Sequence, residues 1–397
     1  MDALILPLNW QRVRLGDIAE IIGGGTPSTQ ITSFWNGSIN WFTPTEIGIT
    51  KYVYKSQRTI TPLGLKNSSA KLLPIGTILL TSRASIGDCA ILKVVATTNQ
   101  GFQSLIPLEK INNEFLYYLI LTLKNKLLKL ASGSTFLEVS PNKIKNLLIP
   151  LPPLNEQIAI ANILSALDRY LYALDALILK KEGVKKALSF ELLSQRKRLK
   201  GFNQAWQRVK VKDFGIIITG STPLTQISEY WNGTISWITP TDINDNKDIF
   251  NSERKITQKG LNTIRMIPKN SVLVTCIASI GKNAILRVNG ACNQQINAII
   301  PNKDFNADFI YYLMENNKQY LLGKAGVTAT YIISKQVFEE IDFFVPKDLN
   351  EQSAIANILS ALDNEIASLK NKKRQFENIK KALNHDLMSA KIRVLKK

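Results

Sequence analysis

The sequence has 397 residues, 45% of them hydrophobic and 20% charged, which is the composition of a globular protein with two or three domains. A formal net charge of +19 at pH 7 predicts a polyanionic partner; nucleic acid is the commonest one, and an anionic membrane surface is the alternative. No apolar run is long enough to span a bilayer and the start does not read as a signal peptide, so we expect a cytoplasmic protein.

Few residues offer metal-binding or nucleophilic chemistry. The cysteines, Cys89, Cys276 and Cys292, form no CxxC pair, and His385 is the single histidine. A zinc site would have to gather these scattered residues, so we expect no metal and no cofactor. His385 has no aligned nucleophile and is expected to face solvent or a partner.

Two copies of one unit make up the chain. The run WQRV at 10–13 returns 196 residues later at 206–209, and WFTPTEI at 41–47 returns as WITPTDI at 237–243. Each unit has a globular part of about 150 residues and a helical part of about 40, a period too long for a solenoid. Two such copies predict a pseudo-two-fold molecule. Further matched pairs are 34–37 with 230–233, 84–87 with 278–281 after a two-residue deletion, 99–100 with 293–294, 115–119 with 309–313, and 155–168 with 350–363.

The globular parts mix strands with a few helices. Short β-rich runs alternate with glycine, proline and asparagine, as at 76–81 and 271–276. One helix is predicted around Asn113 to Leu130, and its counterpart around Ala307 to Leu322. This pattern predicts an α+β domain built on a curved sheet.

A long helix is predicted after each globular part. The run LPPLN at 151–155 stops a strand, because proline is tolerated only before or at the first turn of a helix. Asn155 is the expected N-cap, and Glu156 then meets the helix dipole in the first turn. Apolar residues follow in steps of four and three, which is coiled-coil heptad spacing. The predicted seam residues are Ile160, Leu164, Leu167, Leu171, Leu174, Ile178, Leu188 and Leu192 in the first helix, and Ile355, Leu359, Leu362, Ile366, Leu369, Phe376, Leu383 and Leu387 in the second, with Lys181, Lys185, Lys373 and Lys380 between them.

Such an apolar stripe needs a partner helix, and the other copy supplies one. Pseudo-two-fold pairing makes the helices antiparallel, and forty residues at about 1.5 Å each give a rod of roughly 60 Å. A helical hairpin that only fills out a core is the alternative. The full repetition of segments about 195 residues apart favours a spacer.

If the two globular parts bind DNA, the rigid helix pair would hold these two heads at a fixed separation along the duplex. A turn of B-DNA advances about 34–36 Å, so heads on one face would read half-sites spaced by whole turns. Because the two heads differ in sequence, we expect a bipartite, asymmetric site whose intervening base pairs are not read.

The order of these motifs resembles that of type I restriction–modification specificity subunits. The resemblance rests on the paired units, LPPLNEQ at 151–157, GGTP at 24–27 and the Trp41, Thr43-Pro44, Glu46 block, and it extends from about Trp10 to Leu387. The second copy departs slightly, with GSTP at 220–223 and VPKDL at 345–349. Neither departure threatens the architecture.

The resemblance implies a non-catalytic subunit with one target recognition domain for each half-site. Implied partners are double-stranded DNA, two methyltransferase subunits and endonuclease–translocase subunits, and the methyl donor, ATP and magnesium would belong to those other subunits. The expected boundaries are 1–150 and 201–345 for the recognition domains, and 151–200 and 346–397 for the long helices.

Base reading needs Arg, Lys, Asn or Gln on protruding loops. Two heads that share a frame but read different half-sites should differ there: Arg83 aligns with Ile277, and Asp88 with Lys282. The predicted DNA-binding residues are Lys51, Arg83, Asn99, Gln100, Lys247, Lys282, Asn293 and Gln294.

Two other motifs are given structural interpretations. GGGT at 23–26 lacks the Lys-Ser/Thr of a phosphate-binding loop and is predicted to be a tight turn. Trp41 and Trp237 lie in β-like runs and are predicted to be core residues rather than base-stacking platforms.

Two rival functions remain open. Asp242, Glu253 and Lys255 imitate the spaced acid, acid and lysine of a magnesium-dependent nuclease. The first copy has glutamine and threonine in place of the last two, which favours a chance match. The other rival is a stand-alone DNA-binding or scaffold protein that never joins a modification complex.

Overall fold

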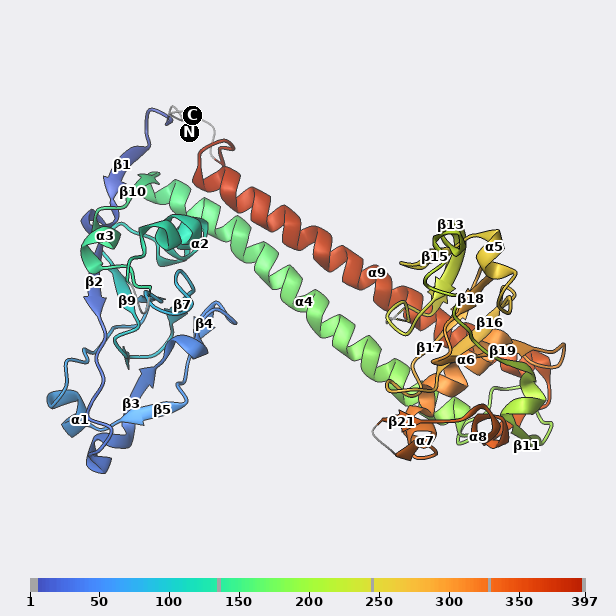
Figure 1. The fold of residues 1–397 in the computed structure, drawn as a ribbon. Helices are drawn as coiled ribbons and strands as arrows, with labels where there is room; N and C mark the ends of the chain where they lie inside the picture. Colours follow the sequence, from blue (N-terminus) through green and yellow to red (C-terminus); the bar gives the residue numbers. More distant parts are fainter. Residues whose placement is uncertain (1–5, 134–136, 244–245, 328–329, 395–397) are drawn as a thin grey trace. The chain divides into compact units, whose positions relative to one another are not determined.

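The computed structural model describes residues 6–133, 137–243, 246–327 and 330–394. The chain folds as two compact units: unit 1 comprises Met1–Asp175 with Asn371–Lys397, and unit 2 comprises Ala176–Lys370 (Figure 1). Each unit thus contains one globular part and one half of each long helix. Within the described residues, no helix is both long and apolar enough to cross a membrane.

Unit 1 contains three sheets. A five-stranded sheet has the order β2-β9-β6-β7-β4, a three-stranded sheet the order β5-β3-β8, and β1 pairs with β10. Strand β4 is parallel to β7 and β3 is parallel to β8, whereas the other ladders are antiparallel. The elements are β1 (Gln11–Arg14), β2 (Ala19–Gly23), β3 (Trp35–Phe42), β4 (Tyr52–Val53), β5 (Arg58–Ile60), α1 (Pro62–Lys66), β6 (Ile78–Leu80), β7 (Cys89–Leu92), β8 (Ala96–Thr98), β9 (Gln103–Pro107), α2 (Asn113–Leu130), α3 (Pro141–Lys145), β10 (Leu148–Leu151) and α4 (Leu154–Leu193).

Unit 2 repeats this topology strand for strand. Its sheets have the orders β12-β19-β16-β17-β14, β15-β13-β18 and β11-β22, and a short β20-β21 ladder is added. The α+β prediction is confirmed, although the expected curved sheet is divided into separate sheets. The elements are β11 (Trp206–Lys210), β12 (Gly215–Thr219), β13 (Trp231–Ile238), β14 (Asp248–Ile249), β15 (Lys255–Ile256), α5 (Gln258–Leu261), β16 (Ser271–Thr275), β17 (Asn283–Leu286), β18 (Gly290–Cys292), β19 (Ile296–Pro301), α6 (Ala307–Asn316), α7 (Lys318–Leu322), β20 (Gly326–Val327), β21 (Tyr331–Ile332), α8 (Lys335–Glu340), β22 (Asp342–Pro346) and α9 (Leu349–Met388).

The helix predicted in each globular part is present, but only the first is continuous. Helix α2 has the predicted bounds, whereas the predicted second helix is split into α6 and α7 at Asn317. The Asn317 side chain donates to the Leu313 carbonyl at 2.8 Å, and its backbone N–H bonds the Met314 carbonyl at 3.1 Å. Asparagine thus competes for backbone groups that a continuous helix would use. The aligned residue in α2 is the buried Leu123.

The core of each unit is completed by a segment from the other half of the chain. In unit 1, the fully buried Phe115 and Tyr118 of α2 share a cluster with Leu387 and Met388 of α9. In unit 2, the corresponding cluster contains Leu192 and Leu193 of α4. Each globular part therefore buries part of its apolar surface only when the distant helix end packs against it.

Helices α4 and α9 pack antiparallel within each unit. In unit 1, the rings of Tyr170 and Phe376 are 4.7 Å apart, and Asp168 and Asp175 pair with Lys380 and Lys373. In unit 2, three further ion pairs cross between the helices. They are Lys181–Glu365 at 2.8 Å, Glu182–Lys370 at 2.7 Å and Lys185–Asp363.

None of the predicted seam residues is exposed; each is buried or half-buried. Those buried are Ile160, Leu164, Leu174, Ile178, Leu192, Ile355, Leu359, Ile366 and Leu387, and those half-buried are Leu167, Leu171, Leu188, Leu362, Leu369, Phe376 and Leu383. The lysines at the remaining seam positions are half-buried as well, each in an ion pair with the facing helix.

The start of each long helix is fixed by a buried carboxylate. Glu156 is 1% exposed and accepts hydrogen bonds from Trp10 at 3.1 Å and from the Arg393 guanidinium at 2.7 and 3.0 Å. Glu351, also 1% exposed, bonds Trp206 and Arg198 in the same way. Each carboxylate therefore joins the residue at or just before the first strand, the start of one long helix and the segment that follows the end of the other, beyond the dipole interaction that was predicted.

The predicted N-cap at Asn155 is wrong. Helix α4 begins one residue earlier, at Leu154, and the Pro153 carbonyl accepts from the Glu156 and Gln157 N–H groups. Because the preceding prolines hold the backbone extended, the helix starts directly behind them. In the second copy, the Asp348 side chain accepts from the Asn350 N–H at 2.8 Å.

The tryptophan prediction is confirmed, whereas the predicted glycine turn is wrong. Trp41 and Trp237 are each 3% exposed. The segment at 24–28 contains no turn or bend, and Gly24 instead lies tightly against the residues that follow β8. A Cβ at Gly24 would stand 1.9 Å from the Asn99 carbonyl oxygen, and one at Gly220 would stand 2.2 Å from that of Asn293. Close backbone approach is therefore what requires glycine here.

We expect Glu156→Gln to lower the free energy of unfolding by about 1–3 kcal/mol, because the half-buried arginine and the buried indole lose a charged acceptor. Urea unfolding at neutral pH measures this. The matched control is Glu377→Gln on the solvent face of α9, where Glu377 makes only a 3.6 Å pair with Lys373; there we expect a change below about 0.5 kcal/mol. Equal effects would contradict the role given to Glu156.

Candidate nucleic-acid interface

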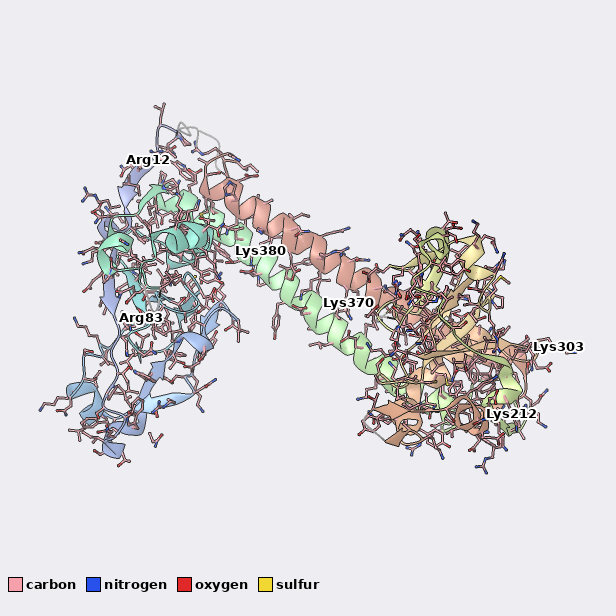
Figure 2. The ribbon with its side chains drawn as sticks, in the orientation of Figure 1. Arg12, Arg83, Lys212, Lys303, Lys370 and Lys380 are labelled. Carbon is pink, nitrogen blue, oxygen red and sulfur yellow. The ribbon has the colours of Figure 1, made fainter. Side chains whose placement is uncertain are left out.

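The excess positive charge is spread over the surface of both units, and many of the cations are paired (Figure 2). Of the residues labelled in Figure 2, Lys212, Lys370, Lys380 and Arg83 each pair with a carboxylate. Arg12 and Lys303 are exposed and have no carboxylate partner in the described part of the chain. A polyanion would therefore meet only a subset of the basic residues.

Lys51 has a structural role rather than the predicted role at a protruding loop. Its side chain is 11% exposed, pairs with Glu114, and donates to Tyr118 Oη at 2.8 Å and Ser165 Oγ of α4 at 2.9 Å. Burial lowers the pKa of Lys51, against the opposing effect of Glu114. The ammonium joins the sheet edge to α2 and α4, and its contact with DNA stays a prediction.

Lys247 occupies the same place in unit 2, and its contact with DNA likewise stays a prediction. Its side chain is 16% exposed and donates to Asp308 at 2.5 Å and to Ser360 of α9 at 3.0 Å. Arg287 also binds Asp308, at 2.7 Å. Burial alone would raise the pKa of Asp308, but the hydrogen bond and charge of Lys247, with the charge of Arg287, lower it overall.

The asparagines of the predicted set shape turns. The Asn99 side chain accepts from the Gly101 N–H at 2.9 Å, and the Asn293 side chain accepts from the Gln295 N–H at 3.1 Å. Asn293 is 8% exposed, and its amide nitrogen is used by the Gln295 side chain at 2.8 Å. The Asn293 amide is thus both buried and hydrogen-bonded within its own turn, and base reading by Asn293 stays a prediction. Asn99 is half-buried, and its role in base reading stays a prediction.

The glutamines next to them are exposed in both units. The Gln100 side chain accepts from the Thr26 hydroxyl, and the Gln294 side chain accepts from the Thr222 hydroxyl at 2.7 Å. Each of these threonines belongs to the Gly-Thr-Pro or Ser-Thr-Pro motif, so the motif holds the glutamine in place. Within the described residues, neither amide nitrogen has a hydrogen-bond partner, so both glutamines remain candidates for contacting DNA.

Arg83 and Lys282 mark where the two units differ. Arg83 is 43% exposed and pairs with Glu138 at 2.9 Å, and its contact with DNA stays a prediction. In unit 1, Asp88 pairs with Lys124 of α2 at 2.5 Å. Its counterpart Lys282 is exposed and has no carboxylate partner in the described part of unit 2.

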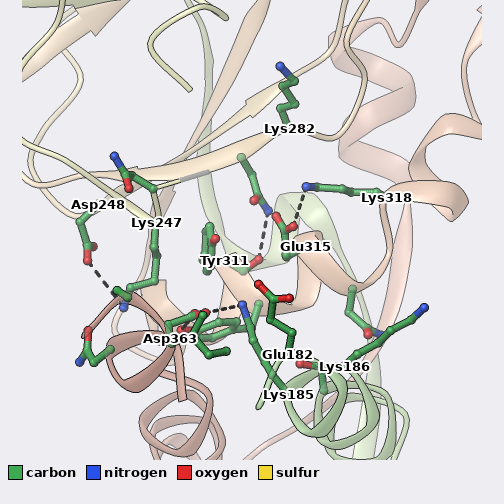
Figure 3. A pocket seen from close by; sticks show the side chains of 18 of the residues that line it. Glu182, Lys185, Lys186, Lys247, Asp248, Lys282, Tyr311, Glu315, Lys318 and Asp363 are labelled. Carbon is green, nitrogen blue, oxygen red and sulfur yellow. Dashed lines mark hydrogen bonds and ion pairs between the residues drawn. The ribbon is translucent and has the colours of Figure 1, made fainter. Parts of the chain in front are cut away.

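A pocket of about 1180 Å³ lies beside Lys282 in unit 2 (Figure 3). Its walls come from α4, α6, α9 and the segment around Lys247, and Figure 3 shows Lys282 across the pocket from Lys185 and Asp363. Lys247, Lys185 and Lys318 in these walls are paired with carboxylates, whereas Lys282 and Lys186 have no carboxylate partner within the described residues.

The acidic residues of the nuclease-like motif accept hydrogen bonds from the backbone. Asp242 accepts from the Thr239 N–H at 2.8 Å and from the Glu253 N–H at 2.8 Å, and Glu46 does the same for Thr43 and Gln57 in unit 1. In the described residues, no three His, Cys, Asp or Glu side chains gather as a metal site. Burial raises the pKa of Cys276 and of Cys292 to about 12, which disfavours the reactive thiolates.

One feature of both units was missed from the sequence. Tyr54 and Phe250, which occupy equivalent positions just after β4 and β14, are 62% and 68% exposed. The available signal was an aromatic residue at the same offset in both copies, followed in each by a polar residue.

Comparison with known proteins gives consistent results for both halves. Residues 7–181 and 203–378 each match the family described as the type I restriction modification DNA specificity domain. The MjaIX specificity subunit of a type I restriction enzyme from Methanocaldococcus jannaschii is 42% identical over 167 residues, 41% of this chain and 39% of that protein. The match thus spans about two fifths of that relative's length.

Two further proteins match over almost the whole chain. The putative type I restriction enzyme MjaX specificity subunit, from the same archaeon, is 26% identical over 417 residues, 98% of this chain and 95% of that protein. The crystal structure of the type I restriction–modification S subunit from M. genitalium aligns with a TM-score of 0.60 at 17% identity. It covers 96% of this chain and 98% of its own, and shows that the two share a fold.

We expect Lys51→Met to lower the free energy of unfolding by about 2–3 kcal/mol, because Glu114 loses its ion pair in a half-buried site. Chemical denaturation measures the change. The exposed Lys66→Met, which removes a lysine without a carboxylate partner in the described residues, is the control and should leave stability within about 0.5 kcal/mol. A Lys51 variant of normal stability that bound DNA weakly would restore the sequence-based interpretation.

The Asp308 network predicts a pH dependence. Because the folded-state pKa of Asp308 lies below its ordinary value of 3.8, the stability it provides is complete above that value and is lost as pH falls through the folded-state pKa. The difference in unfolding free energy between the wild type and Asp308→Asn should be constant from about pH 7 to 5 and shrink toward about pH 3. Urea titrations across this range measure it; a difference that grew with acidity would contradict the assignment.

Proposed function

The chain belongs to the family of type I restriction–modification DNA specificity domains, and from this premise we propose that it is the sequence-reading, non-catalytic subunit of a type I restriction–modification enzyme. The observation that carries the proposal is the pair of topologically identical units completed by two antiparallel helices. Residues 1–150 and 201–345 are the proposed recognition domains, and 151–200 and 346–397 the proposed spacer helices. A cytoplasmic location follows from the proposed DNA substrate.

The two units support an asymmetric, bipartite DNA site. They share their sheet orders and the buried Trp41 and Trp237, which fix a common frame. They differ at exposed positions, as where Asp88 is replaced by Lys282. A common frame with different exposed side chains suits two half-sites of different sequence.

The proposed partners are two methyltransferase subunits and the endonuclease–translocase subunits. Pseudo-two-fold symmetry supports two copies of one partner, because equivalent surfaces recur in both halves of the chain. Co-purification with a methyltransferase subunit tests this part of the proposal. A chain that binds DNA but recovers no such subunit would be the stand-alone protein considered above.

Methylome mapping of the source cell, with and without the gene, tests the proposed function. We expect one bipartite adenine-methylated motif to disappear on deletion, because no other chain would direct methylation to those half-sites. Complementation with the intact gene is the control. An unchanged set of methylated motifs would overturn the proposal.

Shortening both spacer helices tests the division of labour between helices and recognition domains. Removing one heptad from α4 and one from α9 shortens each helix by about 10 Å. The same mapping should show an altered number of base pairs between half-sites, with both half-site sequences unchanged. Altered half-sites would contradict the assignment of base reading to the globular parts.

A further inference from the structure

An aromatic side chain stands in solvent at the same place in both units. Tyr54 follows the edge strand β4 and is 62% exposed, and Phe250 follows the edge strand β14 and is 68% exposed. Large aromatic groups are normally buried, and two exposed at equivalent positions of divergent copies indicate a contact surface. Neither ring takes part in the cores or in the α4–α9 contact described above.

The backbone on both sides of each aromatic residue is fixed. In unit 1, the preceding Val53 is 7% exposed and accepts from the Lys93 N–H at 3.0 Å. Ser56, 4% exposed, accepts from the Trp41 N–H at 2.9 Å and donates to the Arg58 carbonyl at 2.5 Å. Only residues 54 and 55 project between these anchors.

Unit 2 has the same anchors. Ile249 is 5% exposed and accepts from the Arg287 N–H at 2.8 Å. Ser252, 7% exposed, accepts from the Trp237 N–H at 3.0 Å and donates to the Arg254 carbonyl at 2.6 Å. We name residues 54–55 and 250–251 the two recognition tips. Such tips lose little conformational entropy when they bind, because they are already ordered.

The second residue of each tip differs in chemistry. Lys55 and Asn251 are both exposed, and neither has a hydrogen-bond or ion-pair partner in the described part of the chain. Beside the first tip, Lys93 also has no carboxylate partner in the described residues, whereas its counterpart Arg287 is paired with Asp248 at 2.6 Å. The first tip is therefore cationic, and the second presents a neutral amide.

We propose that the recognition tips enter a groove of the DNA, where the aromatic ring packs against bases and the residue after it distinguishes them. This rests on the proposed function. A ring common to both tips makes a sequence-tolerant apolar contact, while lysine donates to the O6 and N7 acceptors of guanine and asparagine pairs with the N6 and N7 groups of adenine. The first half-site then contains a guanine read by Lys55, and the second an adenine read by Asn251.

Charge and sequence divergence favour DNA over a protein surface as the occupant. The cations next to Tyr54 complement a polyanion. Two copies of one protein partner would meet the same side chain at both tips, whereas Lys55 and Asn251 differ as two unlike half-sites require. A methyltransferase contact is the other occupant that the experiment distinguishes.

The experiment uses the chain assembled with its methyltransferase subunits and the duplex motif identified by methylome mapping. We expect Tyr54→Ala to weaken DNA binding about tenfold. Scrambling the first half-site should then cause no further loss of affinity. Phe250→Ala should have the same two effects for the second half-site. Phe344→Ala removes a half-exposed aromatic ring elsewhere in unit 2 and should leave affinity unchanged. Co-purification of the methyltransferase subunits with each variant is measured in parallel.

Exchanging the second tip residues gives a test independent of affinity. Lys55→Asn should shift one position of the first half-site from guanine toward adenine by about tenfold or more, and Asn251→Lys should do the reverse in the second. Two outcomes would overturn the inference. One is an unchanged base preference in both exchange variants. The other is that the aromatic variants lose methyltransferase subunits, while the complexes that still form keep normal DNA affinity. A wild-type assembly with no bipartite preference would instead reject the proposed function itself.

Discussion

The buried carboxylate at the start of each long helix is the interaction on which the architecture depends. Glu156 and Glu351 each accept an indole N–H from a tryptophan at or just before the first strand of their own unit. Each also accepts from the guanidinium of an arginine that follows the end of the other long helix. A carboxylate removed from water is costly unless it is fully paired. Its three attachments therefore form together, so the strand, the helix start and the distant helix end take up one arrangement.

A second contact fixes the angle between each sheet and the helix pair. Lys51 and Lys247 leave the edge of the five-stranded sheet and bond a serine on the long helix of their own copy, Ser165 and Ser360. By residue type both lysines are DNA-binding candidates, because lysine is usually exposed. Their burial shows that both units use the same polar contact to hold the sheet edge against the long helix.

The periodic features of the fold could be predicted from the sequence, because repeated residues at a repeated spacing fold alike. The offset between the copies predicted the symmetry, the heptads predicted the helix pair, and α2 has the expected bounds. Single-residue effects were missed: Asn317 interrupts the second helix, and Pro153 moves the start of α4. Contacts between distant segments, such as Glu156 with Arg393, leave no local pattern, since the two residues are 237 positions apart.

The candidate site was predicted less well for a related physical reason. Residue type indicates what a side chain can bind, but only its surroundings decide whether it is free to do so. Asn293 has the right chemistry for adenine and uses it on its own turn. Tyr54 and Phe250 were overlooked because aromatic residues in β-rich runs are expected in a core.

The division of the chain into units has a consequence for its synthesis on the ribosome. Unit 2 is a continuous stretch, Ala176–Lys370, whereas unit 1 is built from the beginning of the chain and its last residues, Asn371–Lys397. The half that is translated first therefore finishes folding last, because its apolar surface is covered only when the final helix emerges. Until then that surface is exposed to other nascent chains, and the C-terminal helix acts as the closing step of assembly.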